Sequence, residues 1–206
     1  MGGDGMEWMD GARRVGGLAW VAGGVLFGIG WVLAGRPLPG VVTLTLVAAV
    51  LVLAALVVRP VGRATAVAGR VVAVLLAIAF AGAVADRFGL WGGPGASGVS
   101  WGSWSAFVDY TRTLLHGVPL PIATAAAVAA TAAEIVLAAA LLVGRQRRWT
   151  GKAAAGLLTC YLVAMGLSVG WAEVARYAVA VEIGGALLVT VASAARPARA
   201  LAVPCS

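Results

Sequence analysis

The amino-acid sequence predicts an all-α polytopic membrane protein with six transmembrane helices. Of its 206 residues, 62% are hydrophobic and 11% are charged, and the mean hydropathy is +0.98. Soluble domains are typically about 45–50% apolar and about 25% charged, and disordered chains are less hydrophobic still, so the composition excludes both classes. Three uncharged runs, residues 15–35, 37–58 and 153–172, match the ~20 residues that a helix needs to cross a bilayer core.

Three further apolar runs complete the six expected spans. Each carries one ionisable residue: 64–85 with Arg70, 121–144 with Glu134, and 177–195 with Glu182. The side chain of Arg70 lies near the start of its run and is long enough to reach the lipid headgroups. The two glutamates lie deeper in their runs and therefore need partners inside the protein.

The basic residues orient these spans. Eleven fall on one side of a six-span arrangement: Arg13, Arg14, Arg59, Arg63, Arg70, Arg145, Arg147, Arg148, Lys152, Arg196 and Arg199. Four fall on the other side: Arg36, Arg87, Arg112 and Arg176. Since cytoplasmic loops carry the excess of Lys and Arg, we expect a plasma or inner membrane protein with both termini in the cytoplasm. The net charge of +7 then reflects contact with anionic lipids of the bilayer, and no basic cluster interleaved with aromatic residues indicates nucleic-acid binding.

The long connection at residues 86–120 is expected to face outward, and it is rich in Gly and Trp. Within it, five residues recur at helical spacing: Trp104, Phe107, Val108, Thr111 and Leu115. This pattern predicts a short amphipathic helix at the outer interface, where Trp is enriched at the level of the headgroups. Two interpretations stay open, a Trp-anchored surface helix and a lid over a site.

The sequence lacks the residues that several kinds of redox and metal site require. Cys160 and Cys205 form no CxxC motif, and His116 is the only histidine. The chain therefore has no thioredoxin-like motif, no bis-His haem site, no predicted metal site and no G-x-G-x-x-G nucleotide loop. Any electrons must come through a quinone or a redox protein partner, and no cofactor is identified beyond a possible quinone.

Several segments together resemble the DoxX family of small membrane proteins. They include the string D-R-F-G-L-W-G at residues 86–92, Trp101, Phe107, the string A-T-A-A-E at 130–134, and a basic turn at 145–148. The resemblance covers roughly residues 70–195. It implies a four-helix membrane domain similar to the membrane subunit of a thiosulfate:quinone oxidoreductase, and hence a redox-linked role near quinone.

The resemblance divides the chain into three parts. Residues 1–60 form an added N-terminal transmembrane hairpin, and residues 61–196 form the DoxX-like domain with its outward loop at 86–120. Residues 197–206 form a short cytoplasmic tail. The Gly24-x-x-x-Gly28 pattern in the hairpin leaves an oligomer open.

Glu134 is the clearest intramembrane candidate for a functional residue. It lies about 13 residues into its span, or ~20 Å along the helix axis at 1.5 Å per residue. Thr124, Thr131 and Glu134 share one face of this helix, which should turn toward the bundle interior because lipid offers no hydrogen bonds. Either a protonated Glu134 joins helices through hydrogen bonds, or the residue is a proton or quinone-headgroup site.

A second candidate site is a cluster of charges expected in the outer leaflet. Its seven members are Asp86, Arg87, Arg112, His116, Glu173, Arg176 and Glu182. We expect Asp86 and Arg87 to pair with Arg176 and Glu182. The cluster is either a set of ion pairs that neutralises helix ends or a cleft for an anion or quinone. A third stripe, Tyr161, Met165 and Ser168, is interpreted as core packing.

Three function hypotheses follow from these features. The first is a membrane subunit of a quinone-linked oxidoreductase system, which uses the outer cluster and Glu134. The second is a non-enzymatic membrane scaffold or assembly factor whose polar residues serve helix packing. A small-molecule transporter is the third, although the sequence has no clear half-helix breaks and no inverted repeat.

Overall fold

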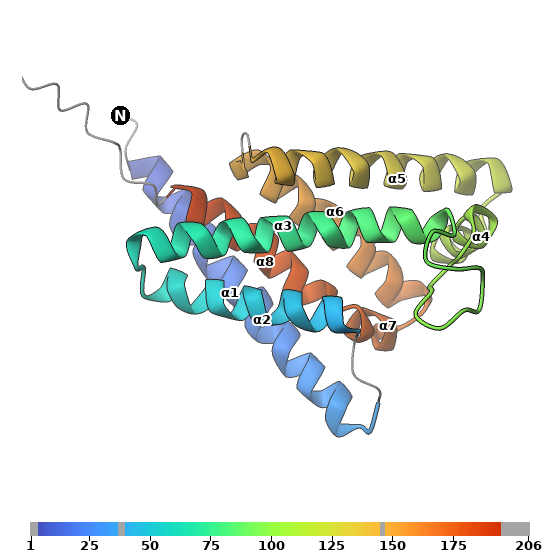
Figure 1. The fold of residues 1–206 in the computed structure, drawn as a ribbon, viewed down its shortest axis with the longest axis horizontal. Coiled ribbons are helices and arrows are strands. Elements are labelled where there is room, and N and C mark those ends of the chain that lie inside the picture. The colour runs from blue at the N-terminus through green and yellow to red at the C-terminus, as the bar shows by residue number, and fades with distance from the viewer. Residues whose placement is uncertain (1–3, 37–39, 145–146, 195–206) are drawn as a thin grey trace, which may run out of the picture.

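The computed structural model describes residues 4–36, 40–144 and 147–194, which form helices and connections without any strand (Figure 1). In chain order the helices are α1 (Asp4–Leu33), α2 (Val41–Val58), α3 (Gly62–Arg87), α4 (Trp104–Leu114), α5 (Leu120–Val143), α6 (Arg147–Ser168), α7 (Trp171–Arg176) and α8 (Val179–Ala194). Among these, α1, α2, α3, α5 and α6 are long and apolar enough to cross a membrane. The expected helical membrane protein is therefore confirmed.

The sixth expected span differs from the sequence prediction. Residues 177–195 do not form one long helix, because a turn at Tyr177 and Ala178 separates α7 from α8, and Ala178 has a φ of 52°. Helix α8 has 16 residues, or ~24 Å at 1.5 Å per residue, against ~30 Å of bilayer core. By length and composition, five described helices qualify as spans.

The helices run back and forth between two ends of the bundle. The start of α1, the α2–α3 turn, the start of α6 and the end of α8 lie at one end, whereas α4 and α7 lie at the other (Figure 1). At the first end, Nη2 of Arg14 donates a hydrogen bond to the carbonyl of Val58 at 2.9 Å. Nη2 of Arg70 donates to the carbonyl of Leu142 at 2.5 Å and joins α3 to the last turn of α5.

Helix α8 is the core of the bundle, because α1, α2, α3 and α6 all pack against it. Ile183, Leu188 and Val189 are buried, and glycines let the neighbouring backbones approach closely. A Cβ atom added at Gly184 would lie 2.8 Å from the carbonyl oxygen of Gly17. Helix α8 therefore contacts other helices over most of its length.

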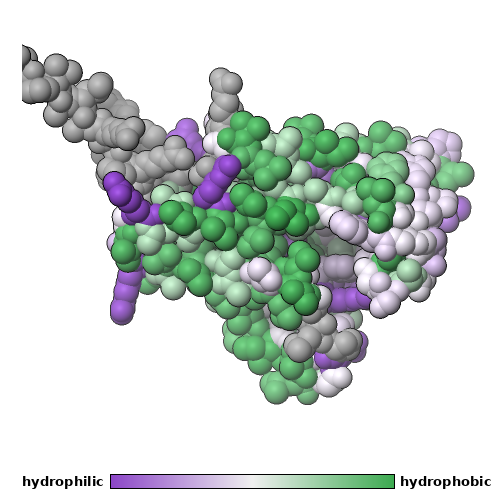
Figure 2. Space-filling model, viewed as in Figure 1, coloured by the Kyte–Doolittle hydropathy of each residue, from purple (hydrophilic) through white to green (hydrophobic). Residues whose placement is uncertain are grey.

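The outer surface of the bundle is hydrophobic along its length. Figure 2 shows apolar side chains over the middle of the visible face and hydrophilic groups toward its ends. Large side chains such as Leu26, Val136 and Leu167 are exposed, although water would disfavour them there. This arrangement fits a lipid environment around the helices.

Helix α4 matches the short helix expected in the outward connection. Ser103 caps its N-terminus by accepting a hydrogen bond from the backbone N–H of Ala106 at 3.2 Å. Phe107 and Val108 are buried, and they form a small apolar cluster with Ala123 and Ala127 of α5. The helix therefore covers the outer part of α5 with its apolar face.

The glycine seam between α1 and α8 generates a stability prediction. Gly184→Ala places a Cβ atom 2.6 Å from Cγ2 of Val21 and 2.9 Å from the Val21 backbone nitrogen, so the helices must separate. We expect a loss of about 1–3 kcal/mol, which thermal unfolding of the purified protein in detergent measures as a lower Tm. Gly156→Ala is the control, because open space surrounds Gly156 and alanine favours the helix by about 1 kcal/mol. Equal Tm changes in the two variants would contradict tight packing at this seam.

Candidate functional site

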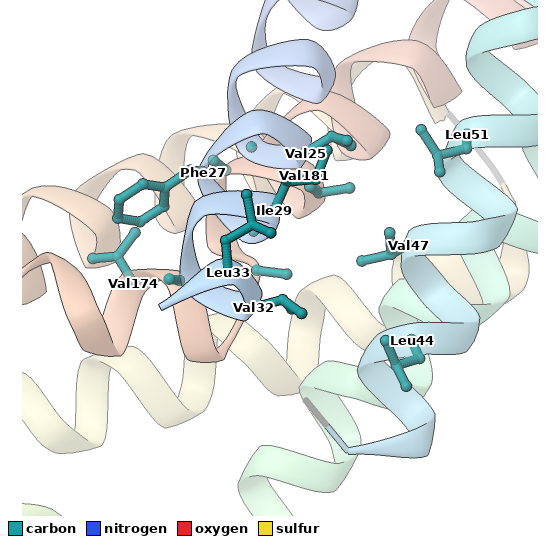
Figure 3. Close-up of a pocket in the computed structure, with 15 residues that line it drawn as sticks. Val25, Phe27, Ile29, Val32, Leu33, Leu44, Val47, Leu51, Val174 and Val181 are labelled. Atoms are coloured by element: carbon teal, nitrogen blue, oxygen red, sulfur yellow. The ribbon is translucent and has the colours of Figure 1, made fainter. Parts of the chain in front are cut away.

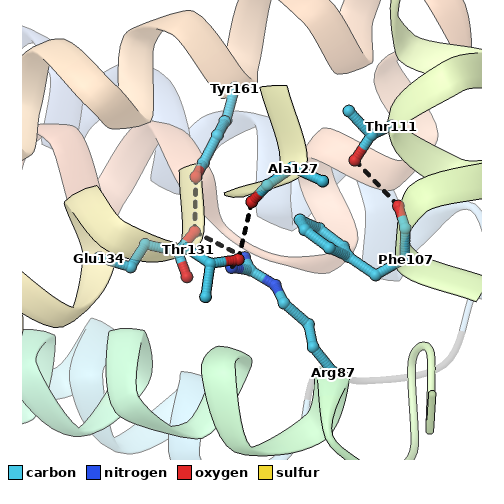
Figure 4. Close-up of polar contacts among 7 residues, drawn as sticks. All are labelled: Arg87, Phe107, Thr111, Ala127, Thr131, Glu134 and Tyr161. Atoms are coloured by element: carbon cyan, nitrogen blue, oxygen red, sulfur yellow. Dashed lines mark hydrogen bonds and ion pairs between the residues drawn. The ribbon is translucent and has the colours of Figure 1, made fainter. Parts of the chain in front are cut away.

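A buried ion pair between α3 and α5 forms the centre of the site (Figure 4). Nη2 of Arg87 lies 2.7 Å from Oε1 of Glu134, and the two side chains are 2% and 1% exposed. A charge-assisted hydrogen bond of this length is a strong one. Because removal of either partner would leave a buried charge without compensation, the pair fixes α3 against α5.

The geometry of antiparallel helices explains why these two residues meet. Side chains lean toward the N-terminus of their own helix. Arg87 ends α3, so its side chain leans back into the bundle, whereas Glu134 leans toward the outer end of α5. The two side chains therefore extend toward one another, and the long stem of arginine spans the remaining distance.

Thr131 and Tyr161 complete the hydrogen bonds around this pair. Nη1 of Arg87 donates to Oγ1 of Thr131 at 2.8 Å, and Thr131 donates to the carbonyl of Ala127 at 2.8 Å. The hydroxyl of Tyr161, from α6, donates to Oε1 of Glu134 at 2.5 Å. One carboxylate oxygen thus receives hydrogen bonds from α3 and from α6, so that the site joins three helices (Figure 4).

Aromatic rings from the connection at residues 86–120 cover the guanidinium group. The Cζ atom of Arg87 lies 3.8 Å from the ring centroid of Phe107 and 5.4 Å from that of Trp101. A cation over an aromatic face gains about 0.5–2 kcal/mol. Helix α4 therefore closes the outer side of the site, which favours the lid interpretation over a helix that only rests on the surface.

Asp86 holds the connection that carries these rings. Its Oδ2 atom accepts hydrogen bonds from the backbone N–H groups of Ser100 at 3.0 Å and Trp101 at 2.9 Å. The hydroxyls of Ser100 and Tyr177 lie 3.0 Å apart, and this contact links the connection to the turn before α8. Asp86 and Arg87 thus have separate tasks, one on the loop and one in the bundle.

The expected pairing of Asp86 and Arg87 with Arg176 and Glu182 is therefore wrong. Arg87 points into the bundle and pairs with Glu134, because α5 offers it a carboxylate and a hydroxyl. Arg176 instead lies near Glu173, three residues earlier on α7, with 3.6 Å between Nη1 and Oε2.

The other members of the expected outer cluster also lie apart. Nε of Arg112 donates to the carbonyl of Val118, and His116 follows α4 with a φ of 57°. No hydrogen bond or ion pair to the Glu182 carboxylate occurs in the described part of the chain. The seven residues do not form one cluster, because α3, α4, α7 and α8 direct them to different neighbours.

Tyr110 is a half-buried residue of α4. Burial raises the pKa of Tyr110 to about 12, and the nearby Tyr177 and Glu173 add to the rise. Its hydroxyl therefore stays protonated at neutral pH and is available as a hydrogen-bond donor.

Two further residues differ from the sequence expectations. Thr124 donates to the carbonyl of Leu120 in its own helix and takes no part in the site. Tyr161, interpreted as core packing, is instead a direct hydrogen-bond partner of Glu134. Its sequence signal was a phenol on an apolar stripe, since a buried tyrosine hydroxyl usually finds a polar partner.

Three buried polar atoms have no hydrogen-bond partner among the described residues: Oδ1 of Asp86, Nε of Arg87 and Oε2 of Glu134. Unsatisfied buried groups are costly, and they mark places where a further donor or acceptor would bind favourably. Nε of Arg87 is a hydrogen-bond donor and Oε2 of Glu134 is an acceptor, so a carbonyl oxygen could pair with the first and a hydroxyl group with the second.

The described residues contain no group of three or more His, Cys, Asp or Glu side chains that could hold a metal ion. Comparison of the whole sequence and structure with protein-family models, curated proteins and solved structures finds no match.

The ion pair predicts a non-additive effect on stability. Arg87→Met should lower the free energy of unfolding by about 3–5 kcal/mol, because Glu134 would stay buried without its partner. Arg87→Met combined with Glu134→Leu should recover much of this loss, since no lone charge remains. Thermal unfolding in detergent measures both, with Arg112→Met as an exposed control. Equal losses in the single and double variants would contradict an energetic coupling between the two residues.

Proposed function

We propose that this protein crosses the inner membrane six times, with both termini in the cytoplasm. Helix α8 returns from the end that holds α4 and α7 to the end where α1 begins (Figure 1). A 16-residue helix is too short to span the bilayer core by itself, but α8 packs against α1, α2, α3 and α6 within the bundle. The positive-inside rule supports the orientation, since Arg14, Arg59, Arg63 and Arg70 all belong to the end with the α2–α3 turn.

Cysteine labelling tests this topology in a variant without Cys160 and Cys205. We expect a cysteine at Val61 and one at Ser206 to react only from the cytoplasm, and one at Ser97 only from outside. A membrane-impermeant maleimide, applied to intact cells and to inverted vesicles, measures the side. Labelling of Ser97 and Ser206 from the same side would show that α8 does not cross.

We further propose that the chain is a DoxX-like membrane subunit of a quinone-linked oxidoreductase. The observation that carries this proposal is that the buried ion pair keeps two polar atoms without a hydrogen-bond partner, Oε2 of Glu134 and Nε of Arg87. A quinol hydroxyl can donate to a carboxylate oxygen, and a quinone carbonyl can accept from a guanidinium N–H. The resemblance of residues 70–195 to that family supports the same function.

The chemistry assigns each side chain a separate task. Oxidation of a quinol releases two electrons and two protons. The Glu134 carboxylate can accept the first proton at Oε2 and pass it to water before it accepts the second. Arg87 and Tyr161 hold its other oxygen in place. The electrons pass to a redox partner protein, because the chain contains no redox motif of its own.

Glu134→Gln tests the proton-accepting task, because glutamine keeps the size and the hydrogen bonds but cannot accept the proton. We expect the variant to unfold at a lower Tm than wild type, because the buried Arg87 loses its charged partner, but to remain folded at the assay temperature. It should bind decylubiquinone within a few-fold of wild type and lose at least tenfold in quinone-linked electron transfer, since a general base typically contributes about 10²–10⁴-fold. Quinone binding is measured by the quenching of tryptophan fluorescence, because Trp101 lies close to Arg87. Glu173→Gln, at a half-buried position on α7 away from the Glu134 site, is the matched control.

A scaffold function is the second candidate, and one observation favours it. The Arg87 guanidinium is enclosed by Phe107, Thr131 and Glu134. The Arg87–Glu134 ion pair with its neighbours therefore also holds α3, α4 and α5 together. If Glu134→Gln folds and retains full quinone-linked activity, the result contradicts a proton-accepting task for Glu134 and favours the scaffold function.

A further inference from the structure

Helix α1 leaves the bundle over its outer half. Gly17 and Gly24 are in tight contact with α8, where a Cβ atom added at Gly24 would lie 2.7 Å from Cγ2 of Val181. One turn further, no heavy atom lies within 4 Å of the position that a Cβ atom at Gly28 would take. Figures 1 and 3 show α1 diverging from α2 over this part of its length.

The divergence opens a groove of about 320 Å³ between α1, α2 and the α7–α8 corner. Leu44, Val47 and Leu51 of α2 face the α1 side chains across the gap (Figure 3). Every residue that lines the groove is apolar. On α1 the lining extends from Gly24 to Leu33, a rise of ~14 Å at 1.5 Å per residue, and one leaflet of hydrocarbon is ~15 Å thick.

A second pocket, of about 340 Å³, lies beside the first and differs in chemistry. The two pockets share Phe27 and Ala175, so they adjoin across α1. The second is lined by Arg36, Trp31 and Trp171, residues typical of the headgroup region. The Cζ atom of Arg36 lies 4.8 Å from the ring centroid of Trp31, and Arg36 has no carboxylate partner among the described residues.

We infer that these adjoining pockets bind one anionic phospholipid. Its phosphate lies at Arg36 between the two tryptophans, and one acyl chain runs along the groove beside Gly28. Charge complementarity selects this occupant, because an arginine without an acidic partner at headgroup level attracts an anion. A neutral isoprenoid quinone would fill the apolar groove but would leave Arg36 without a counterion. This lipid site is separate from the Glu134 site and does not depend on the function proposed above.

Native mass spectrometry of the full chain in detergent tests the site, with phosphatidylglycerol and phosphatidylcholine of identical acyl chains as probes. We expect wild type to retain phosphatidylglycerol about fivefold more strongly than phosphatidylcholine, the effect of one arginine near the headgroup. Arg36→Gln should abolish this preference. Arg112→Gln, which removes one positive charge elsewhere at the same end, should keep it.

The groove is tested separately by Gly28→Leu, whose side chain would occupy the position of the acyl chain. This variant should lose retention of both lipids by at least fivefold while its Tm stays within the range of wild type. Gly23→Leu is the control on the same helix, because Gly23 faces open space outside both pockets. Equal retention of the two lipids by wild type, unchanged retention in Gly28→Leu, or displacement of phosphatidylglycerol by decylubiquinone would each overturn the proposal.

Discussion

A guanidinium group away from water needs a counterion for its charge and acceptors for its N–H groups, and here this requirement draws several helices together. Arg87 takes a carboxylate and a hydroxyl from α5, while α4 lays an aromatic ring over its face. Tyr161 of α6 then shares the same carboxylate oxygen. Because lipid supplies no substitute for any of these partners, the relative positions of α3, α4, α5 and α6 follow from one side chain.

The neighbouring residue shows how the same end of α3 also organises the loop. Asp86 accepts two backbone hydrogen bonds from the connection at residues 86–120, so this connection returns over the site. Gly102, with a φ of 67°, lies where an added Cβ atom would be 2.4 Å from the backbone of Gly93, so only glycine allows the loop to close on itself. Two adjacent charged residues thus position both the interior of the site and its cover.

The parts of this structure that the sequence could predict are those that bilayer thickness determines. Apolar runs of the right length identified five spanning helices, and helical spacing placed Thr131 and Glu134 on one face. The partner of Glu134 was not predictable in the same way, because its identity depends on the axial offset between α3 and α5. Hydropathy likewise could not show that α8 is surrounded by other helices, and it does not detect the turn at Ala178.

The central position of α8 has a consequence for how the protein is made. Helices α1 and α8 pack along a glycine seam, yet more than 140 residues separate the end of one from the start of the other. A ribosome that has delivered the first five spans has therefore placed α1 in the membrane without its main partner. The bundle can reach its final packing only after α8 leaves the translocation machinery, so assembly is a late, cooperative event in biogenesis. Until α8 is present, the earlier helices lack the helix against which they pack.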